Sequence, residues 1–354
     1  MAGFGSLELD LTEKWTTRLG ARYTHDKKEA DLVAATYSPG AADPLNIRLA
    51  TLVAPYVMHS QEAIDKKVTW DASLEFKPRD GALLYARAAK GFKSSSMNAG
   101  VFSPEDISTA GPETVIDYEL GAKTSWLDER LQLNLAAFYY DYQDYQVVIV
   151  QEDTNALRFS NADAARVTGI EVELQAQPAE RFFVRAAYGR SDGEFRSFPR
   201  AAVPVPVNQG QPLDLKGERI PRSPEYTGSL LLQYSVPLAS GNIELQTDWR
   251  WTGQTNFATW VESQQLSPAQ PFVPLLSAIR DGLTQQAYSV GNARIAFVSA
   301  NGDFEIGAWV RNVGDKKYMV NAYPVFYNRN LVQFQGDLRT YGITLTYNFG
   351  GRSN

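Results

Sequence analysis

Paired carboxylates are the residues of this sequence that first suggest chemistry. Glu171 and Glu173 stand two positions apart, and two carboxylates can act as general acid and general base. No nucleophile stands beside them, and residues two apart in a strand simply share one face. Cysteine is absent, and two histidines, His25 and His59, leave little material for a metal site. The sequence therefore predicts no catalytic residue, no metal site and no cofactor, so we do not expect an enzyme.

Candidate ligand contacts lie in two stretches that read as loops, one near each end of the chain. Aromatic rings and arginine in these stretches suit a ligand with aromatic or anionic groups. For each residue the alternative remains that its side chain only packs or solvates its loop. The candidates are Tyr37, Arg48, Tyr56, His59, Tyr323, Phe326, Tyr327, Asn328 and Arg329.

Strands must position these loops, and the stretch 116–142 shows their pattern. Every second residue of its first half is mostly apolar, whereas the residues between them include Glu119 and Lys123. The alternation resumes after a tight turn at 127–130. A period of two predicts extended strands. The hairpin alone fits either a membrane-spanning barrel with aromatic ends or a long amphipathic hairpin of a soluble barrel or sandwich.

The same alternation recurs along the whole chain and predicts about thirteen strands. Tight turns, for example at 78–81 and 239–242, are expected to alternate strictly with long loops, for example at 26–67 and 93–113. Soluble sandwiches mix loop lengths at both ends, whereas outer-membrane barrels have short periplasmic turns and long extracellular loops. The strand expected at 82–92 alternates poorly, and the sequence does not assign its faces.

Charge distribution favours the membrane barrel as well. Residues such as Asp71, Glu119 and Arg250 would be costly in a dry core, but they suit a water-filled lumen. The opposite stripes carry essentially no charge, as a lipid-facing surface requires, because a Lys or Arg at the bilayer midplane costs roughly 2–4 kcal/mol there. The sequence therefore predicts an all-β fold, an antiparallel transmembrane β-barrel with long extracellular loops and short periplasmic turns.

Composition excludes other classes of protein. No apolar run reaches the roughly 18 residues of a transmembrane helix. The net charge of −6, with mixed signs, argues against nucleic-acid binding. The N-terminus has no basic segment followed by an apolar one, so no signal peptide is expected. An odd number of antiparallel strands cannot close a barrel, so we expect the chain to be incomplete as a barrel.

Several stretches resemble segments of the TonB-dependent outer-membrane receptors of the siderophore type. AKGFKSSSMN at 89–98 is similar to the family's AKGFKSGGFN and departs from it at Ser95, Ser96 and Met97. The final strand, Tyr341 to Phe349, resembles the aromatic-ended closing strand that the barrel-assembly machinery reads, although 350–354 extends past it. Further similar segments are PET at 112–114, YELG at 118–121, the pattern NxAxFYYDY at 134–142, NA at 161–162, GIE at 169–171 and NVGDKKY at 312–318.

The resemblance implies a domain organisation and a set of partners. Receptors of this family have 22 strands and a plugged lumen. Residues 1–354 would then be the C-terminal part of the β-barrel, with the N-terminal plug domain absent from this chain. The implied partners are the lipid bilayer, an iron-siderophore or similar ligand, TonB through the missing plug domain, and the barrel-assembly machinery through the last strand. The implied location is the bacterial cell outer membrane.

The implied function is receptor and transporter activity in TonB-dependent uptake of iron-siderophore complexes or similar large solutes. Two alternatives remain open. A passive porin-like channel would conduct small solutes steadily without a plug. A structural or adhesive outer-membrane barrel would use its loops for surface contacts and would not need uptake.

Overall fold

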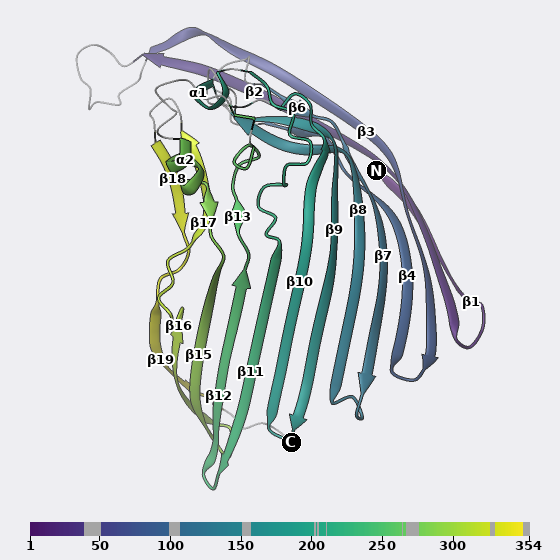
Figure 1. The fold of residues 1–354 in the computed structure, drawn as a ribbon, viewed down its shortest axis with the longest axis vertical. Helices are drawn as coiled ribbons and strands as arrows, with labels where there is room; N and C mark the ends of the chain where they lie inside the picture. Colours follow the sequence, from purple (N-terminus) through teal and green to yellow (C-terminus); the bar gives the residue numbers. More distant parts are fainter. Residues whose placement is uncertain are drawn as a thin grey trace.

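One antiparallel sheet of 13 strands forms the body of the molecule, shown by the computed structural model in Figure 1. The structure describes all residues except 39–50, 99–106, 151–156, 202, 204, 210, 264, 267–275, 326–329 and 350–354. The strands follow one another in chain order across the sheet, and the sheet curves into an open trough (Figure 1). The predicted number of strands and their antiparallel arrangement are confirmed.

The strands of this sheet differ greatly in length. They are β1 (Ala2–Asp10), β2 (Trp15–Ser38), β3 (Thr51–Arg79), β4 (Ala82–Lys93), β7 (Glu113–Trp126), β8 (Leu131–Val150), β9 (Leu157–Ala179), β10 (Phe182–Ser197), β11 (Tyr226–Leu238), β12 (Gly241–Thr252), β15 (Tyr288–Ser299), β16 (Phe304–Arg311) and β19 (Thr340–Tyr347). Short elements lie in the connections. They are β5 (Ser96–Met97), β6 (Thr109–Ala110), α1 (Val205–Asn208), β13 (Thr255–Asn256), α2 (Leu276–Gly282), β14 (Thr284–Gln285), β17 (Met319–Val325) and β18 (Asn330–Gln335).

Tight turns lie together at the lower end of the sheet in Figure 1, and the longer connections lie at the upper end.

The prediction of a loop at 26–67 is largely wrong, because β2 and β3 continue as a paired hairpin to Ser38 and Thr51. The connection between β8 and β9 is likewise only 151–156. In the described part of the β2 and β3 extensions, the face that is apolar near the tight turns becomes charged, and Lys27 forms ion pairs there with Glu29 (2.5 Å) and Glu62 (3.0 Å). Periodicity therefore gives no signal for these strand extensions.

Pairing with β7 assigns the two faces of β4. Arg87 lies opposite Glu119, which places it on the polar face, and Ala88 lies opposite Tyr118 on the apolar face. Lys90 shares the apolar face, because it is two residues beyond Ala88 and opposite Ile116. The expectation that the apolar stripes carry essentially no charge therefore needs this correction at the loop end of β4.

The apolar face of the sheet has no second layer packed against it among the described residues. Leu120 is 64 % exposed and Ile343 is 75 % exposed. Aromatic pairs lie on this face, with the Trp15 and Phe76 rings 4.5 Å apart near the tight turns. Such an uncovered apolar surface is typical of a barrel wall that faces lipid. Within the described part of the chain, no helix combines the length and apolarity that crossing a membrane requires.

Candidate functional site

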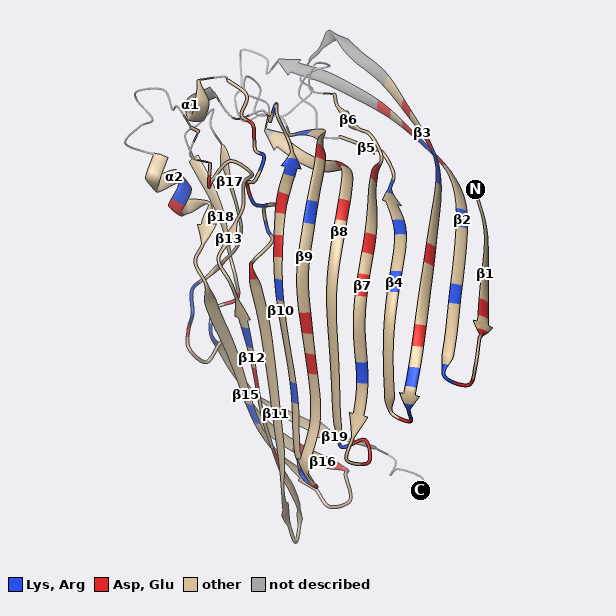
Figure 2. Ribbon diagram, turned by 45° about the vertical axis from the view of Figure 1, so that its right-hand side comes forward, with Lys and Arg blue, Asp and Glu red and all other residues tan. Residues whose placement is uncertain are grey.

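The polar face of the trough carries charges that are paired between neighbouring strands. Figure 2 shows acidic and basic segments recurring along β3, β7, β9 and β10. Arg87 contacts Asp117 at 2.6 Å, and the Tyr85 hydroxyl donates a hydrogen bond to Glu119 at 2.5 Å. Farther along the sheet, the Asn292 amide donates to Asp248 at 2.6 Å. These pairs hold polar groups in place on a surface that water can reach, so this face is suited to line a wet lumen.

An aromatic strip runs along this polar face from the middle of β8 to the loop end of β10. We define it as Phe138, Tyr140, Tyr142, Tyr145 and Phe195. The successive ring centroids lie 4.7, 6.5, 5.3 and 6.1 Å apart, and the first two rings are stacked. Aromatic faces at this spacing bind planar or apolar ligand groups by stacking. Sequence reasoning noted the FYYDY pattern but did not propose its inward aromatic residues as ligand contacts.

Glycines on neighbouring strands make room for the aromatic rings of this face. A Cβ atom at Gly169 would collide with the Phe138 ring, and one at Gly121 would collide with the Tyr85 ring. Each ring therefore lies close against the backbone of the next strand. The aromatic rings therefore lie close to the sheet surface and leave the interior of the trough open.

A compact hydrophobic cluster, here called the loop core, sits at the loop end of the sheet. It joins residues of β8, β9 and β10 to the connection between β10 and β11, the connection between β12 and β15, and β17. Its buried members are Val147, Ala162, Ala165, Phe195, Phe198, Ala201, Val203, Val207, Leu213, Leu215, Ile220, Trp260, Val261, Leu283 and Ala322. Because Phe195 belongs to both groups, the aromatic strip ends directly in the loop core. The long connections are thereby fixed over one end of the trough.

A polar group ties two of these long connections together. Arg280 Nη2 donates to the backbone carbonyl of Ser263 at 2.5 Å, and Ser263 is fully buried. Burial raises the pKa of the Glu218 carboxyl above its usual range, against the opposing effect of a hydrogen bond with Ser263. Arg280 Nε is buried and has no hydrogen-bond partner among the described residues. The group is therefore a polar seam between the connections that follow β10 and β12.

The segments that resemble receptor motifs act here as anchors for loop backbone. Asp65 is 5 % exposed and accepts hydrogen bonds from the backbone N–H (2.8 Å) and the hydroxyl (2.9 Å) of Ser95. Glu113 accepts the backbone N–H of Gln146 at 2.7 Å. The Asn161 side chain accepts from the backbone N–H of Gly111 at 2.7 Å. These polar residues fix where the strands end and the connections begin.

A further anchor is Asn312, directly after β16. Its amide nitrogen donates to the carbonyls of Lys316 (2.9 Å) and Asp337 (3.0 Å). Its side-chain oxygen accepts the backbone N–H of Lys316 at 2.8 Å. The NVGDKKY segment is thus a structural bracket that holds both ends of the connection between β16 and β19.

Of the nine predicted ligand contacts, Tyr323 is the one whose side chain the structure describes. Tyr323 lies on β17, is 44 % exposed and packs against Phe334 with ring centroids 6.0 Å apart. For three more the structure describes only the backbone, on β2 and β3, and the other five lie outside the described residues. Those with described backbone are Tyr37, Tyr56 and His59, and those outside are Arg48, Phe326, Tyr327, Asn328 and Arg329. Their role in binding stays a prediction.

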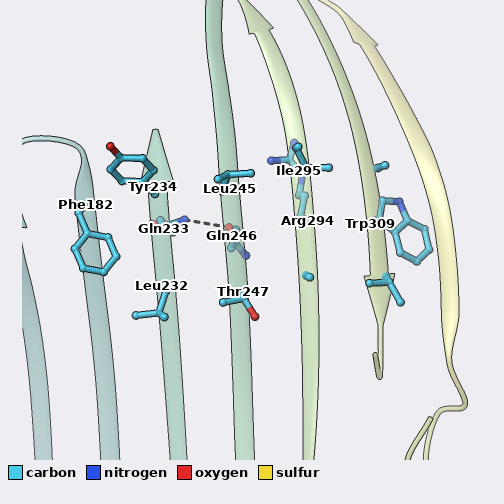
Figure 3. Close-up of a pocket in the computed structure, with 13 residues that line it drawn as sticks. Phe182, Leu232, Gln233, Tyr234, Leu245, Gln246, Thr247, Arg294, Ile295 and Trp309 are labelled. Carbon is cyan, nitrogen blue, oxygen red and sulfur yellow. Dashed lines mark hydrogen bonds between the residues drawn. The ribbon is translucent and has the colours of Figure 1, made fainter. Parts of the chain in front are cut away.

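A shallow depression of about 530 Å³ lies on the opposite, apolar face of the sheet (Figure 3). Leu232, Leu245 and Ile295 line it from three adjacent strands. The hydrogen bond from Gln233 to Gln246 (3.0 Å), drawn in Figure 3, belongs to the polar face behind it. This depression therefore faces away from the lumen. Within the described residues there is also no cluster of three or more His, Asp or Glu that could hold a metal ion.

Residues 1–313 match the family described as "TonB dependent receptor-like, beta-barrel". The "Probable TonB-dependent siderophore receptor PiuA" of Acinetobacter baumannii is 22 % identical over 329 residues, which cover 90 % of this chain and 37 % of that protein. The "Metal-pseudopaline receptor CntO" of Pseudomonas aeruginosa is 21 % identical over 345 residues, covering 97 % of this chain and 40 % of that protein. The chain spans less than half the length of these curated relatives.

Solved structures show the same fold. The ferric yersiniabactin uptake receptor FyuA from Yersinia pestis superimposes with a TM-score of 0.73 at 20 % identity, over 99 % of this chain and 45 % of that one. The siderophore receptor PiuA from Acinetobacter baumannii gives a TM-score of 0.68 at 18 % identity, over 98 % of this chain and 42 % of that one.

Proposed function

The chain belongs to the TonB-dependent receptor β-barrel family, and from this premise we propose that it forms the wall of a receptor that takes up an iron-siderophore or similar metal chelate. Family members are outer-membrane barrels that act as receptors rather than enzymes. The observation that carries the proposal is the continuity of the aromatic strip with the loop core. A ligand held at the loops would meet stacking surfaces that lead into the lumen.

The relatives suggest the class of ligand. By their names, PiuA receives a siderophore, CntO receives a metal-pseudopaline complex, and FyuA takes up ferric yersiniabactin. These ligands are metal chelates, and chelators built on aromatic rings could stack on Tyr142 or Tyr145. We extend the same class of ligand, a metal chelate recognised at the extracellular end, to this chain. The nine sequence candidates remain proposed contacts.

Further strands would complete the barrel. Within the described sheet β1 pairs with β2 alone, and β19 pairs with β16 alone, so both edges are open. Unpaired edges are not tolerated in lipid, because each unsatisfied backbone group costs several kcal/mol there. We propose that residues 1–354 are the C-terminal part of a 22-stranded barrel, the size of such plugged transporters. In the complete receptor, an N-terminal plug domain inside the barrel would contact TonB.

The last strand would also serve assembly. Tyr341 is 81 % exposed on the apolar face, and the Tyr347 and Phe349 rings lie 4.8 Å apart at the strand end. An exposed edge strand is a template for pairing with another chain. We propose that the barrel-assembly machinery reads this aromatic-ended edge during insertion.

Chelate binding tests the proposal. Outer membranes that carry the protein would be titrated with iron-55 ferric yersiniabactin and with an iron-55 ferric catecholate, and the bound label would be counted. We expect saturable binding of at least one of the two chelates, and at least a tenfold loss of affinity in the double variant Tyr142→Ala, Tyr145→Ala. Tyr188→Ala, an exposed tyrosine on the outer face of β10, is the matched control and should bind as the unaltered protein does. Absence of saturable binding of either chelate would refute the proposed ligand class.

A further inference from the structure

A second depression lies on the apolar face, across β2, β3, β4, β7 and β8, and has a volume of about 700 Å³. Its floor is made of small side chains, because Ala72 lies opposite Ala88 and Ala86 follows on the same face. Tyr118 and Leu120 border it on β7. The depression is apolar and opens toward the lipid side of the wall. Its shape and chemistry suit a hydrocarbon chain rather than a polar solute.

Two lysines lie on the same face toward the loop end of this depression. Lys90 is two residues beyond Ala88 on β4 and lies opposite Trp70, and Lys66 lies farther up β3, opposite His25. In the described part of the chain neither lysine side chain makes an ion pair or a hydrogen bond, whereas nearby Lys27 is paired with two glutamates. Lys66 is exposed and Lys90 is half-buried.

The two lysines can serve one ligand. Trp70 is four positions beyond Lys66 on β3, which is about 13 Å along an extended strand. Long lysine side chains extend along apolar surface to place their ammonium groups in the polar layer, so those of Lys66 and Lys90 can converge on one polar headgroup. Trp70 lies beside Lys90 on the neighbouring strand, at the level where aromatic residues mark the membrane interface.

Charge and shape together point to one occupant. Loop-side ends of such barrels face the cell exterior, so the lysines lie at the outer leaflet. Basic residues beside a membrane attract anionic lipid headgroups. We propose that the outer wall binds one phosphate-bearing lipid of the outer leaflet, with an acyl chain in the Ala72, Ala86 and Ala88 depression and a phosphate between Lys66 and Lys90. This site is independent of the chelate site, because it lies on the opposite face of the sheet.

The depression in Figure 3 provides an internal comparison. It also lies on the apolar face, but its cationic lining residue, Arg294, forms an ion pair with Glu305 on the polar face. The lipid-facing side chains of this depression therefore form an apolar surface that an acyl chain can contact. They include no cationic side chain that could bind the lipid headgroup. Filling it by Ala308→Leu should leave retention of an anionic lipid unchanged.

Lipid retention tests the proposal directly. The complete receptor that contains this chain, purified in a neutral detergent, would be incubated with lipid A, freed of excess lipid by gel filtration and analysed by native mass spectrometry. Each single variant, Lys66→Gln or Lys90→Gln, should weaken lipid A binding roughly fivefold, because a lysine near the surface contributes about that factor. Ala88→Leu, which fills the depression, should weaken it further, and Lys90→Arg should retain it. Lys67→Gln, the neighbouring lysine on the polar face, is the matched control and should have no effect.

Competition separates the possible sources of the phosphate. Phosphatidylcholine, which has no net charge, should bind at least tenfold more weakly than lipid A, and millimolar inorganic phosphate should not displace lipid A. Equal binding of lipid A by the unaltered chain and by the glutamine variants would overturn the proposal. Displacement by inorganic phosphate alone would overturn it as well, since the acyl depression would then contribute nothing. Heat-modifiable migration on gels would confirm that each variant is folded before it is scored.

Discussion

The ring of Phe138 on β8 lies against the α-carbon of Gly169 on β9, where any side chain would collide with it. The same ring stacks on Tyr140 at 4.7 Å. One glycine therefore sets the position of the first two rings of the aromatic strip. The strip in turn connects the middle of the wall to the loop core.

Replacing Gly169 should destabilise the wall. In Gly169→Ala the new methyl group would meet both the Phe138 ring and the backbone carbonyl of Arg190. We expect a loss of roughly 1–3 kcal/mol in the free energy of unfolding, as for other overpacked sites. Urea titration of the protein in lipid vesicles measures this. Gly5→Ala, where nothing lies within 4 Å of the new atom, is the control, and equal midpoints for the two variants would contradict the account.

Removing the Asp65 carboxylate should release the segment that follows β4. Asp65→Ala leaves the backbone N–H of Ser95 without its acceptor, and hydrogen bonds to charged groups contribute about 1.5–3 kcal/mol each. We expect faster hydrogen exchange at 94–98, read by mass spectrometry. Asp71→Ala, on the same face of β3 but exposed, should leave that exchange unchanged. Unaltered protection in Asp65→Ala would show that the anchor is not needed.

The Glu218 carboxyl should make the stability of the loop core depend on pH. Burial raises its pKa in the folded protein above the unfolded value, so the folded state binds more protons between these two values. Its contribution is fully present below the unfolded pKa and is lost as pH rises through the raised folded pKa. Glu218→Gln should therefore gain thermal stability over the unaltered protein as pH rises through that window. A melting-temperature difference that stays constant with pH would contradict the prediction.

The proposal of further strands predicts the size of the native receptor. An antiserum against this chain, used on outer membranes of the source cells, should detect a band far above 39.3 kDa. The reason is that the two open edges of the sheet need additional strands in lipid. A band at 39.3 kDa would instead favour a small channel that closes by itself.

Much of the wall could be predicted from the sequence because each membrane-spanning strand places one face in lipid and the other in water. That environment enforces a period of two, and the strand count followed from it. The pattern failed at 26–67, where the β2 and β3 extensions need only backbone pairing and scattered ion pairs. It also failed to assign β4, whose alanines and Lys90 give weak contrast between the faces.

The site was less predictable than the wall. Loop aromatics such as Tyr327 were chosen by residue type, whereas the aromatic strip depends on which face of β8 points inward. The inward set of β8 was already visible as Phe138, Tyr140 and Tyr142 alternating with Tyr139 and Asp141. The loop core and the anchoring roles of Asp65 and Asn312 depend on contacts between residues far apart in the chain. No local pattern encodes such contacts.

The central claim is that this wall belongs to an energised receptor for a metal chelate. The most direct measurement is uptake of iron-55 ferric yersiniabactin and ferric catecholate by source cells, with the gene for this protein deleted and then restored, in the presence and absence of TonB. The account predicts accumulation of at least one chelate that requires both the gene and TonB. Accumulation that persists without TonB and rises linearly with chelate concentration would show a passive channel and contradict the account, as would uptake of both chelates unchanged by the deletion.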